Sequence, residues 1–122
     1  MNDEAGRTPV WAGDGARLPA HLEVSGLVRQ VNSAGGFATV LASGERDAGT
    51  IMLITCCNGK DYRVYERFPQ ASGQRHWLCV RESGEDLPAF IEQRRKRDSD
   101  LWIVELDIAQ AERFIGLPSA TD

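Results

Sequence analysis

The sequence contains little that points to a membrane protein or a secreted protein. None of its apolar runs approaches the roughly 20 residues that a membrane-spanning helix needs. Residues 1–18 lack the basic start and the apolar core of a secretory signal. We therefore expect a cytoplasmic protein that has no membrane partner.

Cysteine and histidine are scarce and poorly placed for chemistry. Cys56, Cys57 and Cys79 are odd in number, and the adjacent pair points to opposite faces of a strand, so reduced thiols are expected. His21 and His76 lie far apart, whereas zinc ligands usually recur at short fixed intervals. His76 and Cys79 are three residues apart on a strand, so they cannot meet as base and nucleophile. The sequence predicts no metal site and no cofactor.

Positive charge is also in deficit. Fourteen Lys and Arg residues stand against eighteen Asp and Glu residues, which gives a net charge of -4. The one basic run, RRKR at 94–97, would spread around a helix, and Asp98 and Asp100 follow it at once. Because carboxylates repel a polyanion, we expect nucleic-acid binding to be disfavoured.

What the sequence does contain is the composition of a globular protein, with 42% hydrophobic and 26% charged residues. Its 122 residues are enough for one hydrophobic core. Residues 1–18 are rich in Gly, Ala and charge without periodicity, and we predict a flexible N-terminal tail there. Residues 19–118 are predicted to form a single α+β domain, and residues 119–122 a second tail.

A first helix is predicted after Pro19 and ends at Gly35 and Gly36. Its apolar face is formed by Val24, Leu27, Val28 and Val31. Phosphate-binding loops run from strand to glycines to helix, so that free helix amides face the anion. The order here is helix, glycines, strand, which argues against a phosphate site.

Four strands are predicted from short apolar, β-branched runs bounded by turn residues, at 37–43, 50–57, 61–68 and 76–82. Asn58-Gly59 is a strong hairpin signal, and the short connections indicate an antiparallel arrangement. A second helix is predicted within 83–100, a fifth strand over 101–107 and a short helical turn after it. The predicted fold class is α+β: an antiparallel β-meander of four strands plus a fifth strand, packed against two main helices, in the order α-β-β-β-β-α-β.

One predicted strand face combines basic and aromatic residues. Arg63, Tyr65 and Arg67 alternate with apolar residues over 61–68 and share one side of the strand. Such a face could stack bases or anchor a protein partner. We treat these three residues as the candidate binding surface, against the alternatives of a solvated sheet face or a dimer contact.

The segment VSGLVRQVNSAGGFATVLASGERDAGTIMLI, followed by DSDLWIVEL and ERFIG, resembles a small bacterial family, domain of unknown function 1491. The resemblance covers about residues 20–116, and the family is found mainly in alphaproteobacteria. It has no established activity. Polar residues in the resembling segments form a candidate polar network, in which buried Arg and carboxylates would pair. Its members are Arg29, Asp47, Asp98, Asp100 and Glu105.

These observations favour a non-enzymatic cytosolic module that binds a protein partner or itself, through an exposed strand edge. The alternative is a small-ligand-binding protein or enzyme that uses the Arg29 and Asp/Glu cluster. A further alternative is nucleic-acid binding through Arg63, Tyr65, Arg67 and the basic run at 94–97.

Overall fold

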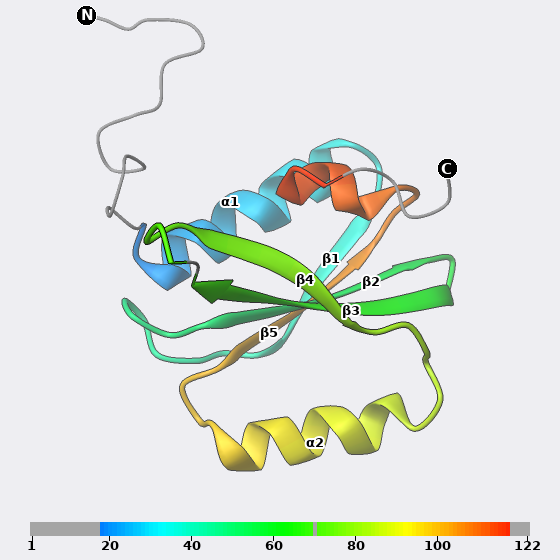
Figure 1. Cartoon of the computed structure of the whole chain (residues 1–122). Helices are drawn as coiled ribbons and strands as arrows, with labels where there is room; N and C mark the ends of the chain where they lie inside the picture. The colour runs from blue at the N-terminus through cyan, green and yellow to red at the C-terminus, as the bar shows by residue number, and fades with distance from the viewer. Residues whose placement is uncertain (1–17, 70, 118–122) are drawn as a thin grey trace, which may run out of the picture.

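The computed structural model describes residues 18–69 and 71–117 of the chain (Figure 1). Apart from Leu18, the tail predicted over residues 1–18 therefore lies outside the described residues, and so does the tail at 119–122. The boundaries at 19 and 118 stay predictions. Within the described residues, no helix is long and apolar enough to cross a membrane.

The predicted α+β class and the order of its elements are confirmed. Two α-helices, five strands and a 3-10 helix follow one another within the described residues. They are α1 (Ala20–Ser33), β1 (Phe37–Ala42), β2 (Ile51–Cys57), β3 (Lys60–Pro69), β4 (Arg75–Arg81), α2 (Leu87–Arg97), β5 (Trp102–Asp107) and η2 (Ala111–Ile115). The predicted C-terminal helical turn corresponds to η2. The predicted tight turn at Asn58 and Gly59 is also present, with φ of 53° and 72°.

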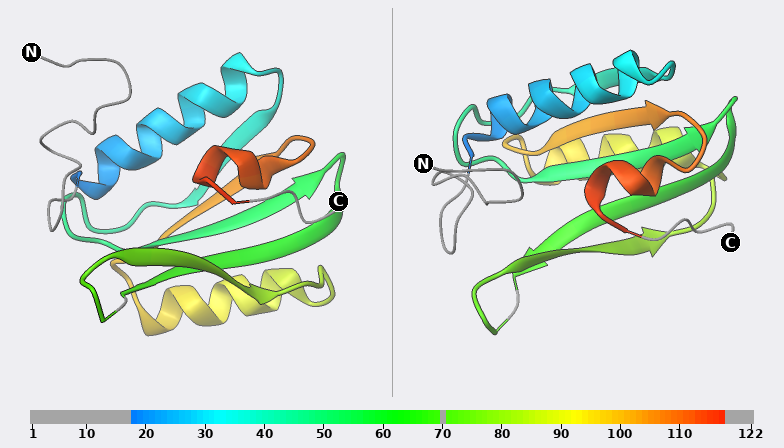
Figure 2. Two further views of the ribbon diagram at one scale, coloured as in Figure 1. Left: turned by 45° about the horizontal axis from the view of Figure 1, so that its top comes forward. Right: turned by 90° about the horizontal axis from the view of Figure 1, so that it is seen from above.

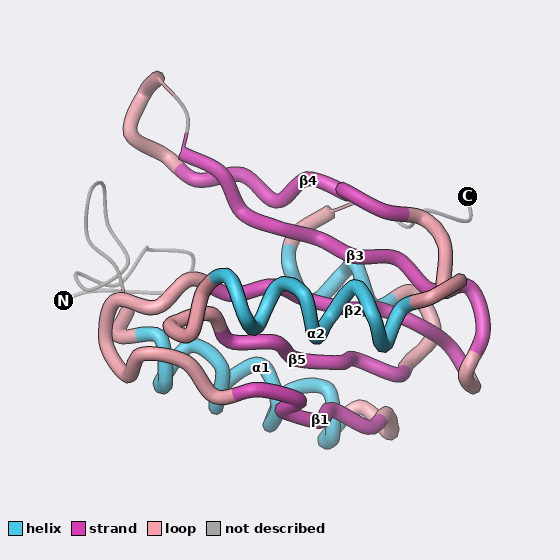
Figure 3. The backbone as a smooth tube through the Cα atoms, turned by 90° about the horizontal axis from the view of Figure 1, so that it is seen from below, coloured by secondary structure: helices cyan, strands magenta, loops and turns pink. Residues whose placement is uncertain are grey.

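The predicted meander of four strands is wrong at its first strand. The sheet order is β1-β5-β2-β3-β4, so only β2, β3 and β4 follow one another as a meander. The last strand, β5, lies between β1 and β2, antiparallel to β1 and parallel to β2. The sheet is therefore mixed, with β1 and β4 at its two edges (Figure 3).

The loop over residues 43–50 explains why β1 and β2 do not pair. Instead of making a tight hairpin, it wraps around the start of β5: the Glu45 amide donates to the carbonyl of Asp100, and the Trp102 indole donates to the carbonyl of Glu45. The same loop accepts hydrogen bonds from the first amides of α1, those of Ala20 and His21. Its backbone therefore fixes the start of a helix and of a distant strand together.

The sheet separates two hydrophobic layers. α1 and η2 cover one face, which we call the α1 face, and α2 covers the opposite face, the α2 face (Figures 1 and 2). Alternate residues of the buried strand β2 enter the two layers, Leu53 on the α1 face and Met52 and Ile54 on the α2 face. Burying each such side chain contributes roughly 1.5–3 kcal/mol. The central strands thus carry the core, while both edge strands keep exposed apolar residues.

Candidate functional site

The predicted binding surface is only partly a surface. Arg63, Tyr65 and Arg67 share one side of β3 as predicted, and that side is the α1 face, but Tyr65 is not part of a surface, because η2 covers it and leaves it 4% exposed. Its hydroxyl donates to Glu112 Oε2 at 2.8 Å. Burial, and then the hydrogen bond to Glu112, raise the pKa of Tyr65.

Arg67 is held within the protein rather than offered to a ligand. Its Nη2 donates to Glu23 Oε1 of α1 at 3.0 Å, and its guanidinium stacks 4.6 Å from the centroid of the Trp77 ring. The side chain bridges β3, β4 and α1, which is a structural role. Of the three predicted residues, Arg63 alone lines a pocket among those described.

The five residues of the candidate polar network occupy four places in the fold. Arg29 lies on α1, Asp47 in the β1–β2 loop and Glu105 on the α2 face of β5, while Asp98 and Asp100 share the α2–β5 loop. Across residues 18–69 and 71–117, no recorded ion pair joins two of them. The structure thus places these residues on one helix, one strand and two loops.

The basic run at 94–97 is partly neutralised. Arg94 forms a bidentate ion pair with Glu66 of β3, including a 3.0 Å bond from Nη2 to Oε1, and lies 3.8 Å from Met52 Sδ. The hydrogen bond to Glu66 raises the pKa of Arg94. This residue ties α2 to the sheet, so it is not available to a polyanion.

Carboxylates and a thiol gather on the α2 face near the end of β5. Burial, and then the charges of Glu105 and Asp107, raise the pKa of Cys56 to about 11. A thiol of this kind stays protonated and is a poor nucleophile. Burial and Asp107 also raise the pKa of Glu105. In the described part of the chain no group of three or more His, Cys, Asp or Glu side chains is arranged to hold a metal ion.

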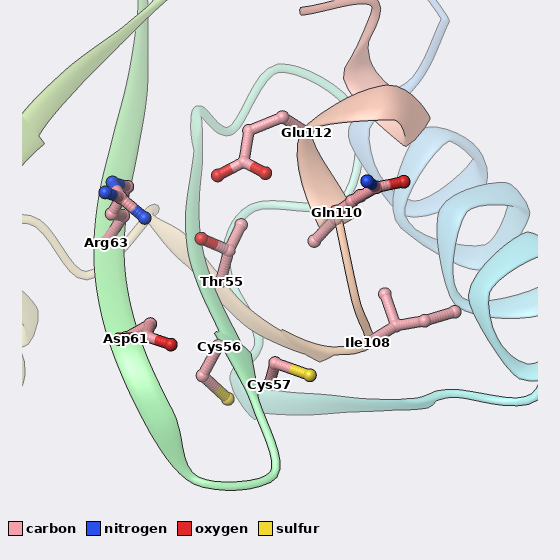
Figure 4. Close-up of a pocket in the computed structure, with 9 residues that line it drawn as sticks. Thr55, Cys56, Cys57, Asp61, Arg63, Ile108, Gln110 and Glu112 are labelled. Carbon is pink, nitrogen blue, oxygen red and sulfur yellow. The ribbon is translucent and has the colours of Figure 1, made fainter. Parts of the chain in front are cut away.

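A small pocket of about 50 Å³ lies on the α1 face, between the end of the β2–β3 hairpin and the turn into η2 (Figure 4). We call it the polar pocket. Gln110 turns the chain into η2 with a left-handed φ of 55°, which places Glu112 over the sheet. The polar residues that line the polar pocket are Thr55, Asp61, Arg63, Gln110 and Glu112, and Cys57 also lines it.

A larger groove of about 410 Å³ lies between α1 and the edge strand β1, and we call it the α1–β1 groove. Its apolar lining comes from two valines of the helix, Val40 of the edge strand and Trp102 at the start of β5. Arg29 is the cation at its rim. The full lining is His21, Val24, Ser25, Val28, Arg29, Val40, Ser43 and Trp102.

Sequence reasoning missed both cavities because each depends on long-range packing. Glu112 falls in a short C-terminal segment with weak periodicity, and Thr55 looks like an ordinary strand residue. A usable signal existed for the groove: β1 is an apolar strand without a charged residue, and it follows an amphipathic helix directly.

This architecture defines a small α+β protein with a five-stranded mixed sheet between two helical layers. Residues 18–116 match the family model described as protein of unknown function (DUF1491), and the chain belongs to this family. The resemblance seen in the sequence is thereby confirmed.

Solved structures support the same assignment. The chain is similar to the crystal structure of a DUF1491 family protein from Caulobacter crescentus CB15, with a TM-score of 0.74, 29% identity and coverage of 83% of this chain and 97% of that one. It is also similar to the solution structure of protein Atu0922 from A. tumefaciens, with a TM-score of 0.69, 30% identity and coverage of 85% and 99%. No curated protein matches the chain.

Proposed function

We propose that this protein is a non-enzymatic, cytoplasmic interaction module that binds an extended segment of a partner protein along the edge strand β1. The observation that carries the proposal is the α1–β1 groove, which lies directly beside an uncharged sheet edge. When a peptide adds a strand to a sheet edge beside a helix, its main-chain hydrogen bonds to the edge give affinity. The groove beside the edge binds alternate side chains of the peptide.

β1 lacks two of the devices that usually protect a sheet edge, charged residues and proline, although its pairing with β5 shifts register between Val40 and Ala42. It pairs with β5 on one side, and among the described residues no strand pairs with its other side. Its sequence, FATVLA, has no charged residue and no proline, and Phe37, Val40 and Leu41 remain exposed. Charged residues and proline commonly block the edges of natural sheets, so an apolar edge without them favours pairing with another chain.

The opposite edge is chemically different. β4 begins at Arg75 and ends at Arg81, and in an antiparallel pair of two β4 strands centred on Leu78 these arginines would lie opposite one another. Like charges in that position are unfavourable. β4 is therefore a poor edge for pairing with a second copy of itself, although it too has exposed apolar residues.

The residues that line the α1–β1 groove indicate which kind of peptide segment would bind there. Val28, Val40 and Trp102 favour apolar side chains at every second position of an extended peptide. Arg29 lies at the rim of the groove, and no ion pair is recorded for Arg29 within the described residues. It therefore favours a peptide that carries an acidic residue next to the apolar positions. The expected partner segment is thus extended, apolar at alternate positions and acidic at one end.

The other two functions find less support. An enzyme built on Arg29 and the carboxylates needs these side chains together, and they lie on separate elements. A nucleic-acid surface needs Arg67 and Arg94, whose guanidinium groups are bound to Glu23 and Glu66.

A peptide-display selection on the purified protein tests the proposal, with the footprint of each selected peptide mapped by amide chemical shifts. Selected peptides should share the predicted pattern and shift amides of β1 and α1. Val40→Lys should weaken their binding at least tenfold. Val80→Lys is the matched control, because Val40 is 39% exposed and Val80, on the other edge, is 43% exposed.

Peptides that bind Val40→Lys as tightly as the wild type, or whose footprint lies outside the α1–β1 groove, would contradict the proposal. If no peptide is selected but the protein forms dimers that Val40→Lys abolishes, the edge is used by a second copy of this chain instead.

A further inference from the structure

The polar pocket contains a buried carboxylate whose hydrogen bonding is incomplete. Glu112 is 5% exposed, and Tyr65 donates to its Oε2. Within the described residues no donor is recorded for Oε1. Because a buried carboxylate needs several donors to offset the loss of water, the free oxygen marks a place for another hydrogen-bond donor.

Thr55 adds a second buried polar group to the same pocket. It is 3% exposed, and its hydroxyl has no recorded partner in the part of the chain that the structure describes. Figure 4 shows the Glu112 carboxylate directed toward Thr55, from η2 toward β2. Thr55 and Glu112 are the two buried polar residues of the described core. Their meeting in one small cavity indicates a ligand that donates to both.

Arg63 lines the same pocket from β3 and provides the opposite charge. No ion pair within 4.0 Å is recorded for it among the described residues, so it does not neutralise Glu112 directly. Because Asp61 also lines it, the pocket presents two carboxylates and one cationic donor group. A ligand that carries only one charge would leave either the carboxylates or the guanidinium unpaired.

We propose that the polar pocket binds the zwitterionic head group of a free α-amino acid. Its ammonium group donates to Glu112 Oε1 and to the Thr55 hydroxyl, and its carboxylate accepts hydrogen bonds from the Arg63 guanidinium. A volume of about 50 Å³ matches such a head group, because a single water needs roughly 10–15 Å³ of the same measure. The amino-acid side chain then extends into solvent.

This inference is independent of the proposed function. The polar pocket and the α1–β1 groove share no lining residue. Because the two cavities are separate, the experiment on one proposal can fail without affecting the other.

Amide chemical shifts of the full-length protein during titration with glycine test the inference, since glycine is the head group alone. We expect saturable shifts at Thr55, Cys57 and Gln110. Acetate and methylammonium, each with one of the two charges, should cause smaller shifts at the same concentrations. Glu112→Gln and Arg63→Gln should each weaken glycine binding at least tenfold, whereas Glu105→Gln on the opposite sheet face should not.

Arg63→Gln keeps the test decisive if Glu112→Gln fails to fold, because Arg63 is only half-buried. The inference is overturned if glycine causes no saturable shift around the pocket. It is equally overturned if the shifts persist in Arg63→Gln, or if acetate alone reproduces them.

Discussion

At the scale of single residues, Glu105 is a carboxyl group in an unfavourable place. It projects from β5 onto the α2 face, where burial and the neighbouring charge of Asp107 raise its pKa. A group whose pKa is raised by folding stabilises the native state at low pH, where the carboxyl is protonated. That contribution is lost as the pH rises through the folded pKa.

Glu105→Gln is therefore expected to be more stable than the wild type at pH 7, because the amide stays neutral. The difference should disappear below about pH 4, near the ordinary pKa of a glutamate. Urea unfolding midpoints at both pH values measure it. Glu82→Gln, at an exposed position, is the control and should change little. Equal stability of Glu105→Gln and wild type at pH 7 would contradict the expectation.

Residue types alone misled the sequence interpretation of β3. Arg63 and Arg67 suggest a wet strand face, yet Arg67 lies over Trp77 and pairs with Glu23, and Tyr65 is covered by η2. A guanidinium can cover an aromatic ring and still satisfy its charge, so an arginine is a weak indicator of solvent. The burial of Glu112 could not be predicted either, since its partner Tyr65 lies 47 residues away.

At the scale of elements, the loop between β1 and β2 depends on close backbone contact. Gly44 and Gly49 lie against the carbonyl of Asp100, and a Cβ at either position would overlap it. The contact lets the loop pass around the start of β5. The helix α1 contains the opposite case: a Cβ at Gly26 would meet nothing within 4 Å.

Gly44→Ala is expected to destabilise the protein by about 1–3 kcal/mol, because backbone must move to admit the methyl group. Gly26→Ala, its control, should stabilise α1 by about 0.5–1 kcal/mol, since glycine is a poor residue in a helix interior. Chemical denaturation of both variants provides the comparison. If the two substitutions changed stability in the same direction, the proposed role of the loop contact would be wrong.

Local patterns predicted the elements well because each depends on its own periodicity and turn residues. The buried run of β2, the Asn58-Gly59 turn and the order of helices and strands all follow from short segments. The pairing of β5 between β1 and β2 does not, because it is decided by contacts about fifty to seventy residues apart along the chain. The α1–β1 groove could not be predicted for the same reason, because Trp102 of β5 forms part of its lining.

At the scale of the whole molecule, β5 joins two parts that have little other connection in the sheet. One part is α1 with β1, and the other is the β2–β4 meander. β5 also contributes Ile103, Val104 and Leu106 to the two core layers. Loss of an edge strand would leave the remaining strands paired, whereas loss of β5 would separate β1 from the rest of the sheet.

A chain that ends at Asp100 is expected not to fold, because it leaves both parts without their shared strand. Amide chemical-shift dispersion and circular dichroism test this. A chain lacking residues 1–17 is the control and should fold, since the family match begins at residue 18. Native-like dispersion in the chain ending at Asp100 would contradict the central role of β5.

The position of β5 also has a consequence for synthesis. Translation delivers β5 after the four other strands, so the nascent chain contains β1 and β2 without the strand that pairs with both of them until residues 102–107 leave the ribosome. During that interval two apolar strands are open to any neighbouring chain. The complete sheet can form only after β5 has been synthesised, and the timing of that step relative to chaperone capture decides how much native protein a cell obtains.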